Sequence, residues 1–248
     1  MTVLHLIGIG TGNPDHLTRQ AIRALNEADL VLIPRKGETK ADLAELRRSI
    51  CAEVITNPGT CIAEFDYPIR DAEADYAQAV EGWHDAIARV WSETIAANGS
   101  PERVALLVWG DPSLYDSTLR IAARLGLETR VVPGITSLQA LTAAHAIPLN
   151  DIGAPVVITT GRQLRDHGWP ADAQTVAVML DGNCSFQTLD PTGIYIFWGA
   201  YVGMKEQVLF AGPLAETGPQ IVTARAQARA EHGWIMDIYL LRKHRSIT

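Results

Sequence analysis

Two short apolar runs with a helical pattern between them set the fold of the beginning of the chain. Residues 3–9 form one continuous apolar run, and residues 30–34, LVLIP, form the next. Between them, apolar residues recur at helical spacing from Leu17 to Ala28. Continuous runs of this length are typical of strands covered on both faces, and a helix between two such strands favours a parallel sheet with a right-handed crossover. The chain therefore begins with a β-α-β unit, whose helix is expected over residues 14–29.

Predicted strands and helices continue to alternate along the chain, and a turn-rich stretch divides them into two parts. Strands are predicted at residues 103–111, 129–134, 156–161, 175–180 and 194–199, and helices at residues 40–50, 72–97, 112–125 and 136–146. Two final strands, at 220–227 and 234–241, are predicted to form an antiparallel hairpin. Residues 147–155 are rich in turn formers. We therefore expect two α/β domains, residues 1–150 with a mostly parallel sheet and residues 151–248 with a mixed one.

Composition excludes several classes of protein. The net charge of −7 argues against a general nucleic-acid binder, which carries a basic excess on one face. No apolar run approaches the roughly 20 residues of a membrane span. The 3 cysteines form no CxxC pair, and the 7 histidines show no metal-ligand spacing. These features predict a reduced cytoplasmic protein with neither a membrane segment nor a bound metal.

The glycine-rich turn after the first strand, GIGTGNPDHLT at residues 8–18, is a candidate dinucleotide-binding site. The fingerprint of such a site is G-x-G-x-x-G, followed by an acidic residue at the end of the second strand. Here the third glycine, Gly12, comes one residue early, and Pro14 follows it. The acidic candidate, Asp29, precedes the second strand, and the chain after that strand is basic. The nicotinamide interpretation fails on both counts, while a plain tight turn still fits the glycines.

Two further strand-to-helix junctions have the same character. VWGDPSLYDS occupies residues 108–117 and VPGITS occupies residues 132–137. Each has a structural explanation, since Asp111, Thr136 or Ser137 would serve as a helix N-cap. All three junctions nevertheless follow strands of one parallel sheet, and open α/β sheets bind ligands at the carboxyl edge.

These three motifs in this order, GxGxGxPxxLT, GDPxxY and PGxTS, resemble the tetrapyrrole methylases. The resemblance extends over both domains through VITTGR, VMLDG, WGAY and EHGWIMDIYLLR. It implies an S-adenosylmethionine-dependent methyltransferase that leaves S-adenosylhomocysteine. It further implies that the cofactor lies folded in the cleft between the two domains, held largely by backbone groups.

The resemblance also implies site residues. Matched to the motifs, the cofactor-binding residues are Pro14, Gly110, Asp111, Leu114, Tyr115, Thr136 and Ser137. Many relatives carry Tyr-Met-Gly where this chain has FWG, so that Trp198 takes the methionine position. Trp198 is therefore either a cofactor contact or an ordinary core tryptophan.

Within the family, the likeness implies methyl transfer to C1 of a corrin precursor, precorrin-5, with loss of an acetyl group as acetate. A sulfonium methyl is a strong electrophile, so the protein has mainly to align it with the ring carbon. Removal of the acetyl group needs water and a proton acceptor. Asp111, Tyr115 and His145 are the candidates, with Asp111 and Tyr115 in the catalytic role.

The substrate implied by the resemblance is a polyacid, and basic residues near the ligand edge would bind it. Arg35 and Lys36 follow the second strand, and Arg19 lies on the first helix. They are either partners of substrate carboxylates or ordinary solvated side chains. Relatives are usually homodimers, and the helix at 72–97 with Trp83 and Trp91 is either a dimer surface or intramolecular core.

Other functions stay open on the sequence alone. The same fold serves enzymes that methylate another tetrapyrrole, RNA or a protein, and a non-enzymatic module would need only the cofactor site. RNA requires a basic surface that the composition does not offer.

Overall fold

The computed structural model describes residues 1–35, 41–68 and 76–243. The chain divides into two compact units, Met1–Thr136 and Ser137–Thr248. The sequence placed the division in the turn-rich stretch around residue 150. In the structure the helix that begins at Ser137 belongs to the second unit.

The first unit is built on a parallel sheet of five strands in the order β3-β2-β4-β1-β5. Its strands are β1 (Val3–Gly8), β2 (Leu30–Arg35), β3 (Cys61–Asp66), β4 (Arg103–Val108) and β5 (Glu128–Val132). The predicted parallel sheet is confirmed. Because all the strands run the same way, the loops that follow them meet along one edge.

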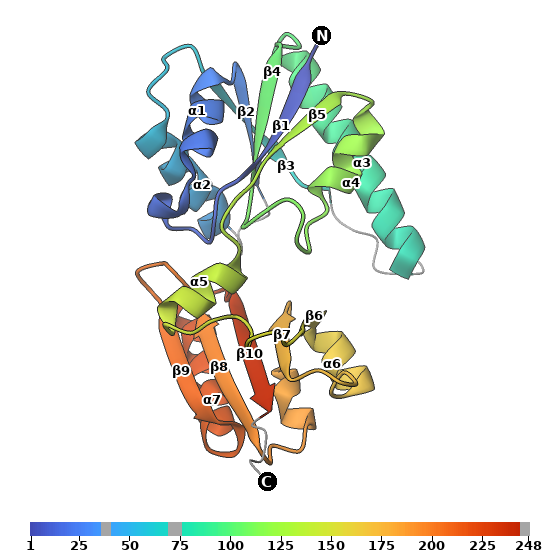
Figure 1. Ribbon diagram of the computed structural model, residues 1–248. Coiled ribbons are helices and arrows are strands. Elements are labelled where there is room, and N and C mark those ends of the chain that lie inside the picture. The colour runs from blue at the N-terminus through green and yellow to red at the C-terminus, as the bar shows by residue number, and fades with distance from the viewer. Residues whose placement is uncertain (36–40, 69–75, 244–248) are drawn as a thin grey trace. The chain divides into compact units, whose positions relative to one another are not determined.

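Helices cover both faces of this sheet (Figure 1). One face carries α1 (Arg19–Glu27) and α2 (Ala41–Val54), and the other carries α3 (Tyr76–Ala97) and α4 (Thr118–Ala122). Trp91 of α3 is fully buried beneath the sheet. Trp83 donates a hydrogen bond through Nε1 to the Pro68 carbonyl oxygen at 2.7 Å. The tryptophans of this helix are therefore intramolecular packing, the second of the two alternatives that the sequence left open.

The helices after β1 and β4 begin later than expected. A short 3₁₀ turn, η1 (Pro14–His16), precedes α1, whose N-cap is Thr18. The helix predicted over 112–125 is reduced to α4 and the 3₁₀ turn η3 (Ala123–Leu125). Carboxylates of Asp111 and Asp116 accept hydrogen bonds from backbone N–H groups two residues further on, and such local bonds compete with helix formation.

The second unit contains a mixed five-stranded sheet in the order β6-β7-β10-β8-β9, as predicted (Figure 1). Only β6 and β7 are paired in parallel. The strands are β6 (Val156–Thr160), β7 (Thr175–Met179), β8 (Ile194–Ala200), β9 (Val208–Pro213) and β10 (Asp237–Lys243). The helical segments are α5 (Ser137–Ala144), α6 (Gly161–His167), η4 (Ser185–Thr188) and α7 (Leu214–His232).

The predicted C-terminal hairpin is wrong. Residues 220–227 lie inside α7, and β10 pairs with β7 and β8 instead. Ile221 and Ala228, seven residues apart on one face of the helix, are both buried. Gly233 ends the helix in the left-handed region with φ 71°. The β-branched Ile-Val-Thr run suggested a strand, but the following Ala, Arg and Gln residues are good helix formers and the packing favours the helix.

Candidate functional site

Four glycines bring the carboxyl ends of β1, β4 and β5 into backbone contact. A Cβ placed on Gly134 would lie 2.1 Å from the Gly110 carbonyl oxygen and 2.8 Å from Gly8 Cα. The Gly110 N–H donates to the Gly10 carbonyl oxygen at 2.7 Å, and the Gly10 N–H donates back at 3.3 Å. The three sequence motifs therefore meet at one place, because only residues without side chains permit this approach.

Asp111 ties two of these loops together. Its Oδ2 accepts a hydrogen bond from the Gly134 N–H at 2.9 Å, across to the loop after β5. Its Oδ1 accepts from the Ser113 N–H at 2.8 Å and from Ser113 Oγ at 2.5 Å. Burial alone would raise the pKa of this carboxyl, but these hydrogen bonds outweigh it and hold the pKa below its usual value. Asp111 is therefore ionised at neutral pH.

We expect Asp111→Asn to lower the free energy of unfolding of the first unit by about 1–3 kcal/mol at neutral pH. An amide presents N–H groups on one side, so either Gly134 or Ser113 faces a donor and loses its acceptor. Because the folded-state pKa of Asp111 is lowered, its contribution is complete above the unfolded-state pKa of about 3.9 and disappears as the pH falls through the folded-state pKa. Urea unfolding of both proteins between neutral and acidic pH would measure this.

A matched control for that experiment is Asp190→Asn. The Asp190 carboxylate accepts an exposed turn bond from the Thr192 N–H at 3.0 Å, a role that an asparagine fills equally well. Its stability should therefore stay close to that of the parent. An Asp111→Asn variant as stable as this control would show that Asp111 does not tie the loops.

The loop after β1 is held by its own side chains. Asn13 Oδ1 accepts from the Asp15 N–H at 3.0 Å, and Pro14 occupies the first position of η1, where no N–H is needed. Thr11 Oγ1 lies 3.1 Å from His16 Nδ1, within hydrogen-bond distance. The loop thus presents a fixed main chain beside Gly110.

The remaining predicted cofactor residues of the first unit follow these glycines. Leu114 donates its N–H to the Asp111 carbonyl oxygen at 3.3 Å. Tyr115 adopts a positive φ of 49°, which is uncommon outside glycine, and the residue is 45% exposed. Burial of part of the ring raises the pKa of its hydroxyl. Thr136 Cα lies 3.6 Å from the position of a Cβ on Gly110.

Predicted residues of the second unit have other surroundings. Ser137 is the first residue of α5. Trp198 is fully buried, and its Nε1 donates to Asp237 Oδ2 at 3.1 Å, so the indole is a core side chain. The Trp198 carbonyl oxygen accepts a bond from His145 Nε2 at 3.1 Å. Burial lowers the pKa of His145 despite this bond, so its imidazole is neutral at pH 7.

The two predicted basic residues that the structure describes, Arg35 and Arg19, have different surroundings. The Arg35 guanidinium is paired with Asp66 at 3.0 Å and with Glu64 at 3.7 Å. Arg19 is the exposed first residue of α1. Lys36 lies outside the described residues.

Sequence reasoning missed two features. The bond from Gly134 to Asp111 joins two motifs, and no spacing within either motif reveals it. A cavity of about 150 Å³ opens between β2 and β4 with Arg47, Tyr67 and Trp109 in its wall. Arg47 carried no signal because a lone arginine on a helix is ordinary.

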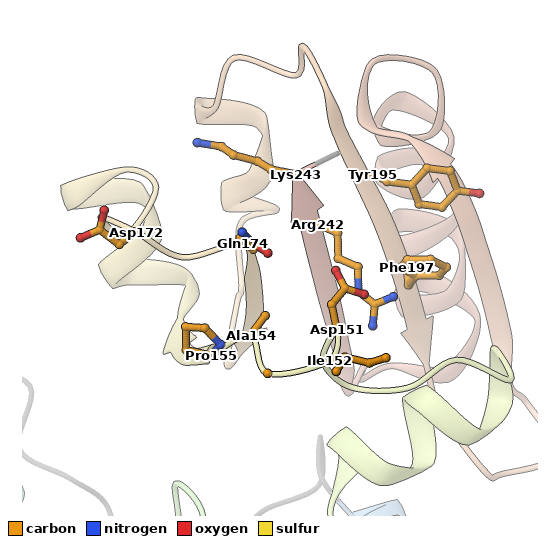
Figure 2. A pocket seen from close by; sticks show the side chains of 11 residues that line it. Asp151, Ile152, Ala154, Pro155, Asp172, Gln174, Tyr195, Phe197, Arg242 and Lys243 are labelled. Carbon is orange, nitrogen blue, oxygen red and sulfur yellow. The ribbon is translucent and has the colours of Figure 1, made fainter. Parts of the chain in front are cut away.

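A cavity of about 660 Å³ lies in the second unit (Figure 2). Its cationic side chains already have partners there: the Arg242 guanidinium is 5.5 Å from the centre of the Phe197 ring, and Lys243 Nζ is 4.4 Å from the centre of the Trp169 ring. Arg242 also donates to the Pro148 carbonyl oxygen. Among the residues that the structure describes, none of the predicted site residues lines this cavity.

The described part of the chain offers neither a metal-binding group nor a membrane-spanning helix. It contains no group of three or more His, Cys, Asp or Glu residues arranged to hold a metal ion. In the same part, the helices are too short or too polar to span a membrane.

A family model, a relative and a solved structure each match nearly the whole chain or most of it. Residues 3–218 match the model of the family described as Tetrapyrrole (Corrin/Porphyrin) Methylases. A precorrin-6A synthase (deacetylating) from Sinorhizobium sp is 48% identical over 98% of this chain and 96% of its own length. The crystal structure of a putative cobalamin synthesis related protein (CobF) from Corynebacterium diphtheriae has a TM-score of 0.83 at 40% identity, covering 98% of this chain and 99% of that one.

A more distant solved structure shares the fold. It is the uroporphyrin-III C-methyltransferase from Thermus thermophilus complexed with S-adenosylhomocysteine, with a TM-score of 0.55 at 21% identity. The alignment covers 96% of this chain and 96% of that one.

Proposed function

The chain belongs to the tetrapyrrole (corrin/porphyrin) methylases, and we propose that it methylates C1 of precorrin-5 and releases the acetyl group as acetate, giving precorrin-6A. The observation that supports this reaction is the 48% identity, over 98% of the chain, to a precorrin-6A synthase of the deacetylating type. Relatives that carry other names cover less of the chain or are less similar to it.

The cofactor of this methylase is S-adenosylmethionine, as in the rest of its family. When bound, it supplies an electrophilic methyl group on a sulfonium centre. The edge formed by β1, β4 and β5 fits a ligand held by main-chain groups. Gly110 has a positive φ of 61°, a backbone conformation that residues with side chains rarely adopt, and it presents no side chain that would separate a ligand from the main chain of this edge.

We assign cofactor binding in the first unit to the loops that this edge brings together. The residues are Pro14, Gly110, Asp111, Leu114, Tyr115 and Thr136. The roles of Ser137 and Trp198 toward the cofactor remain predictions from the resemblance, and a contact from Trp198 would have to come from its main chain because the indole is in the core.

Asp111 and Tyr115 are the proposed catalytic residues of this edge. They differ in whether they can accept or donate a hydrogen bond at neutral pH. Three hydrogen bonds and a lowered pKa keep Asp111 an acceptor, so it cannot donate a proton at neutral pH. The raised pKa of Tyr115 keeps its hydroxyl protonated and therefore able to donate a hydrogen bond. His145, neutral at pH 7, is a further proton acceptor for the water that removes the acetyl group.

The proposed function also covers the residues that bind the substrate, the oligomeric state and the cellular compartment. Arg19, Arg35 and Lys36 are proposed to meet substrate carboxylates, although Arg35 would first have to leave Asp66 and Glu64. We also propose that the enzyme is a cytoplasmic homodimer. The cysteines are unpaired in the structure, which suits a reducing compartment, and light scattering would give the oligomeric state.

We expect the purified protein to convert precorrin-5, S-adenosylmethionine and water into precorrin-6A, with acetate and S-adenosylhomocysteine released in equimolar amounts. Methylation without acetate would point to another tetrapyrrole reaction, and cofactor binding without turnover would point to a non-enzymatic module. Thermal shift adds a direct comparison of ligands. S-adenosylhomocysteine at about 100 times its Kd should stabilise the protein by about 2.7 kcal/mol, and NAD should not.

A further inference from the structure

The cavity between β2 and β4 lies at the same sheet edge as the glycine contact. It is lined by Pro34 at the end of β2, Val108 and Trp109 at the end of β4, Arg47 of α2, and Tyr67 after β3. Asp116 and Thr118 close it at the start of α4. Trp109 directly precedes Gly110, so the cavity and the proposed cofactor edge share one stretch of chain.

Arg47 brings a positive charge to this cavity, and the part of the chain that the structure describes gives it no ion pair. Among the described residues, no carboxylate lies within ion-pair distance of its guanidinium. Its two hydrogen bonds are long and go to main-chain oxygens, from Nε to Leu107 at 3.4 Å and from Nη1 to Leu43 at 3.3 Å. Burial lowers the pKa of Arg47 to about 10. A partly buried guanidinium held only in this way is incompletely compensated.

Asp116 offsets part of this charge without neutralising it directly. Its Oδ1 accepts from the Thr118 N–H at 2.6 Å and from Thr118 Oγ1, so that oxygen is used at the start of α4. Its electrostatic effect favours the charged form of Arg47, as does that of Tyr67. An anion entering the cavity would therefore meet Arg47 as its principal counter-charge.

Trp109 supplies a second donor. Its Nε1–H is buried and has no hydrogen-bond partner in the described part of the chain. The Arg47 guanidinium carbon lies 4.8 Å from the centre of the Trp109 ring, so the cation is stacked on the indole. Buried N–H donors without partners are rare in folded proteins, and this one, unlike that of Trp91, belongs to a residue that lines a cavity.

We propose that this cavity binds a single carboxylate group, with the Arg47 guanidinium and the Trp109 Nε1–H as its donors. Its volume of about 150 Å³ suits a group the size of acetate or propionate rather than a whole cofactor. Resting on the proposed function, we assign the occupant as one carboxylate arm of the tetrapyrrole. The alternative source is free acetate, and the experiment separates the two.

The first experiment uses acetate alone and does not depend on turnover. The 6 tryptophans give six indole N–H resonances, and Trp109→Phe identifies one of them. Acetate should shift the Trp109 resonance saturably, while neutral acetamide of the same shape should not. The Trp91 indole is an internal control, because its Nε1 is also without a partner but does not line the cavity.

Substitutions in α2 test whether Arg47 binds the acetate that shifts the Trp109 resonance. Arg47→Met keeps most of the aliphatic stem and should abolish the acetate shift, and Arg47→Lys should retain a weaker one. Arg48→Met is the matched control, since Arg48 is paired with Glu45 and Glu64 at 2.7 Å each and does not line the cavity. The proposal is overturned if the Trp109 resonance is unmoved by acetate, responds equally to acetamide, or still shifts in a folded Arg47→Met protein.

The second experiment distinguishes the source of the carboxylate. If the cavity holds a substrate arm, Arg47→Met should raise the KM for precorrin-5 roughly tenfold or more and leave the KM for S-adenosylmethionine unchanged. In the parent protein, acetate should then compete with precorrin-5. An unchanged KM for precorrin-5 would refute the substrate assignment. If the protein does not turn over precorrin-5 at all, the proposed function fails while the acetate titration still decides the cavity.

Discussion

Replacing Gly134 with alanine is expected to lower the free energy of unfolding of the first unit by roughly 3 kcal/mol and to abolish binding of S-adenosylhomocysteine. The added Cβ would lie 2.1 Å from the Gly110 carbonyl oxygen and 2.8 Å from Gly8 Cα, and all of these are backbone atoms. No side-chain rotation relieves such a contact, so the loops after β1, β4 and β5 have to separate. Urea unfolding and calorimetric titration with S-adenosylhomocysteine would measure the two effects.

Gly82→Ala is the matched control. Gly82 is exposed within α3, and a Cβ there would meet nothing within 4 Å. Alanine favours the helix, so this variant should gain up to about 1 kcal/mol and bind the ligand normally. If Gly134→Ala were as stable as Gly82→Ala and bound the ligand equally, the close approach of the three strand ends would be refuted.

The parallel sheet of the first unit could be predicted because buried strands are written into the sequence as continuous apolar runs. β1 and β4 are almost wholly buried, and both were recognised. β3, at the edge of the sheet, alternates poorly and has mostly exposed or half-buried residues, so the sequence predicts no strand there. The segment inside α7 was misassigned because its local β-branched run was weighed without the burial of Ile221 and Ala228 on one helical face.

The site was predictable as an edge but not as a set of contacts. Strand direction alone brings the loops containing Gly10, Gly110 and Gly134 together, and this follows from the pattern of strands and helices. The bond from Gly134 to Asp111 depends on the geometry of two turns. The cavity beside Trp109 depends on which face of α2 carries Arg47, a register that tertiary packing sets.

The second large effect is expected in the second unit, where Arg225→Met should cost about 3–5 kcal/mol of stability. Arg225 Nε donates to Asp237 Oδ2 at 2.9 Å, and the two side chains are only 11% and 7% exposed. The same oxygen accepts the Trp198 indole N–H at 3.1 Å, and Arg225 Nη2 also donates to the Asp181 carbonyl oxygen at 3.1 Å. Removing the guanidinium leaves a buried carboxylate with one neutral donor. Thermal and urea unfolding would measure the loss.

The pH dependence separates this loss of charge compensation from a simple packing defect. Burial raises the pKa of the Asp237 carboxyl even with Arg225 in place, and Arg225 opposes that rise, so removing Arg225 should raise the pKa further and favour uptake of a proton by the folded variant. A raised folded-state pKa gives stability that is present at low pH and is lost as the pH rises, so the variant should be closer to the parent at about pH 5 than at about pH 8. Arg165→Met is the control, since its pair with Asp166 is 42% and 46% exposed and should contribute at most about 1 kcal/mol. A destabilisation of Arg225→Met that does not change with pH would mean that Arg225 acts by filling space, and that Trp198 is held in the core without the help of this ion pair.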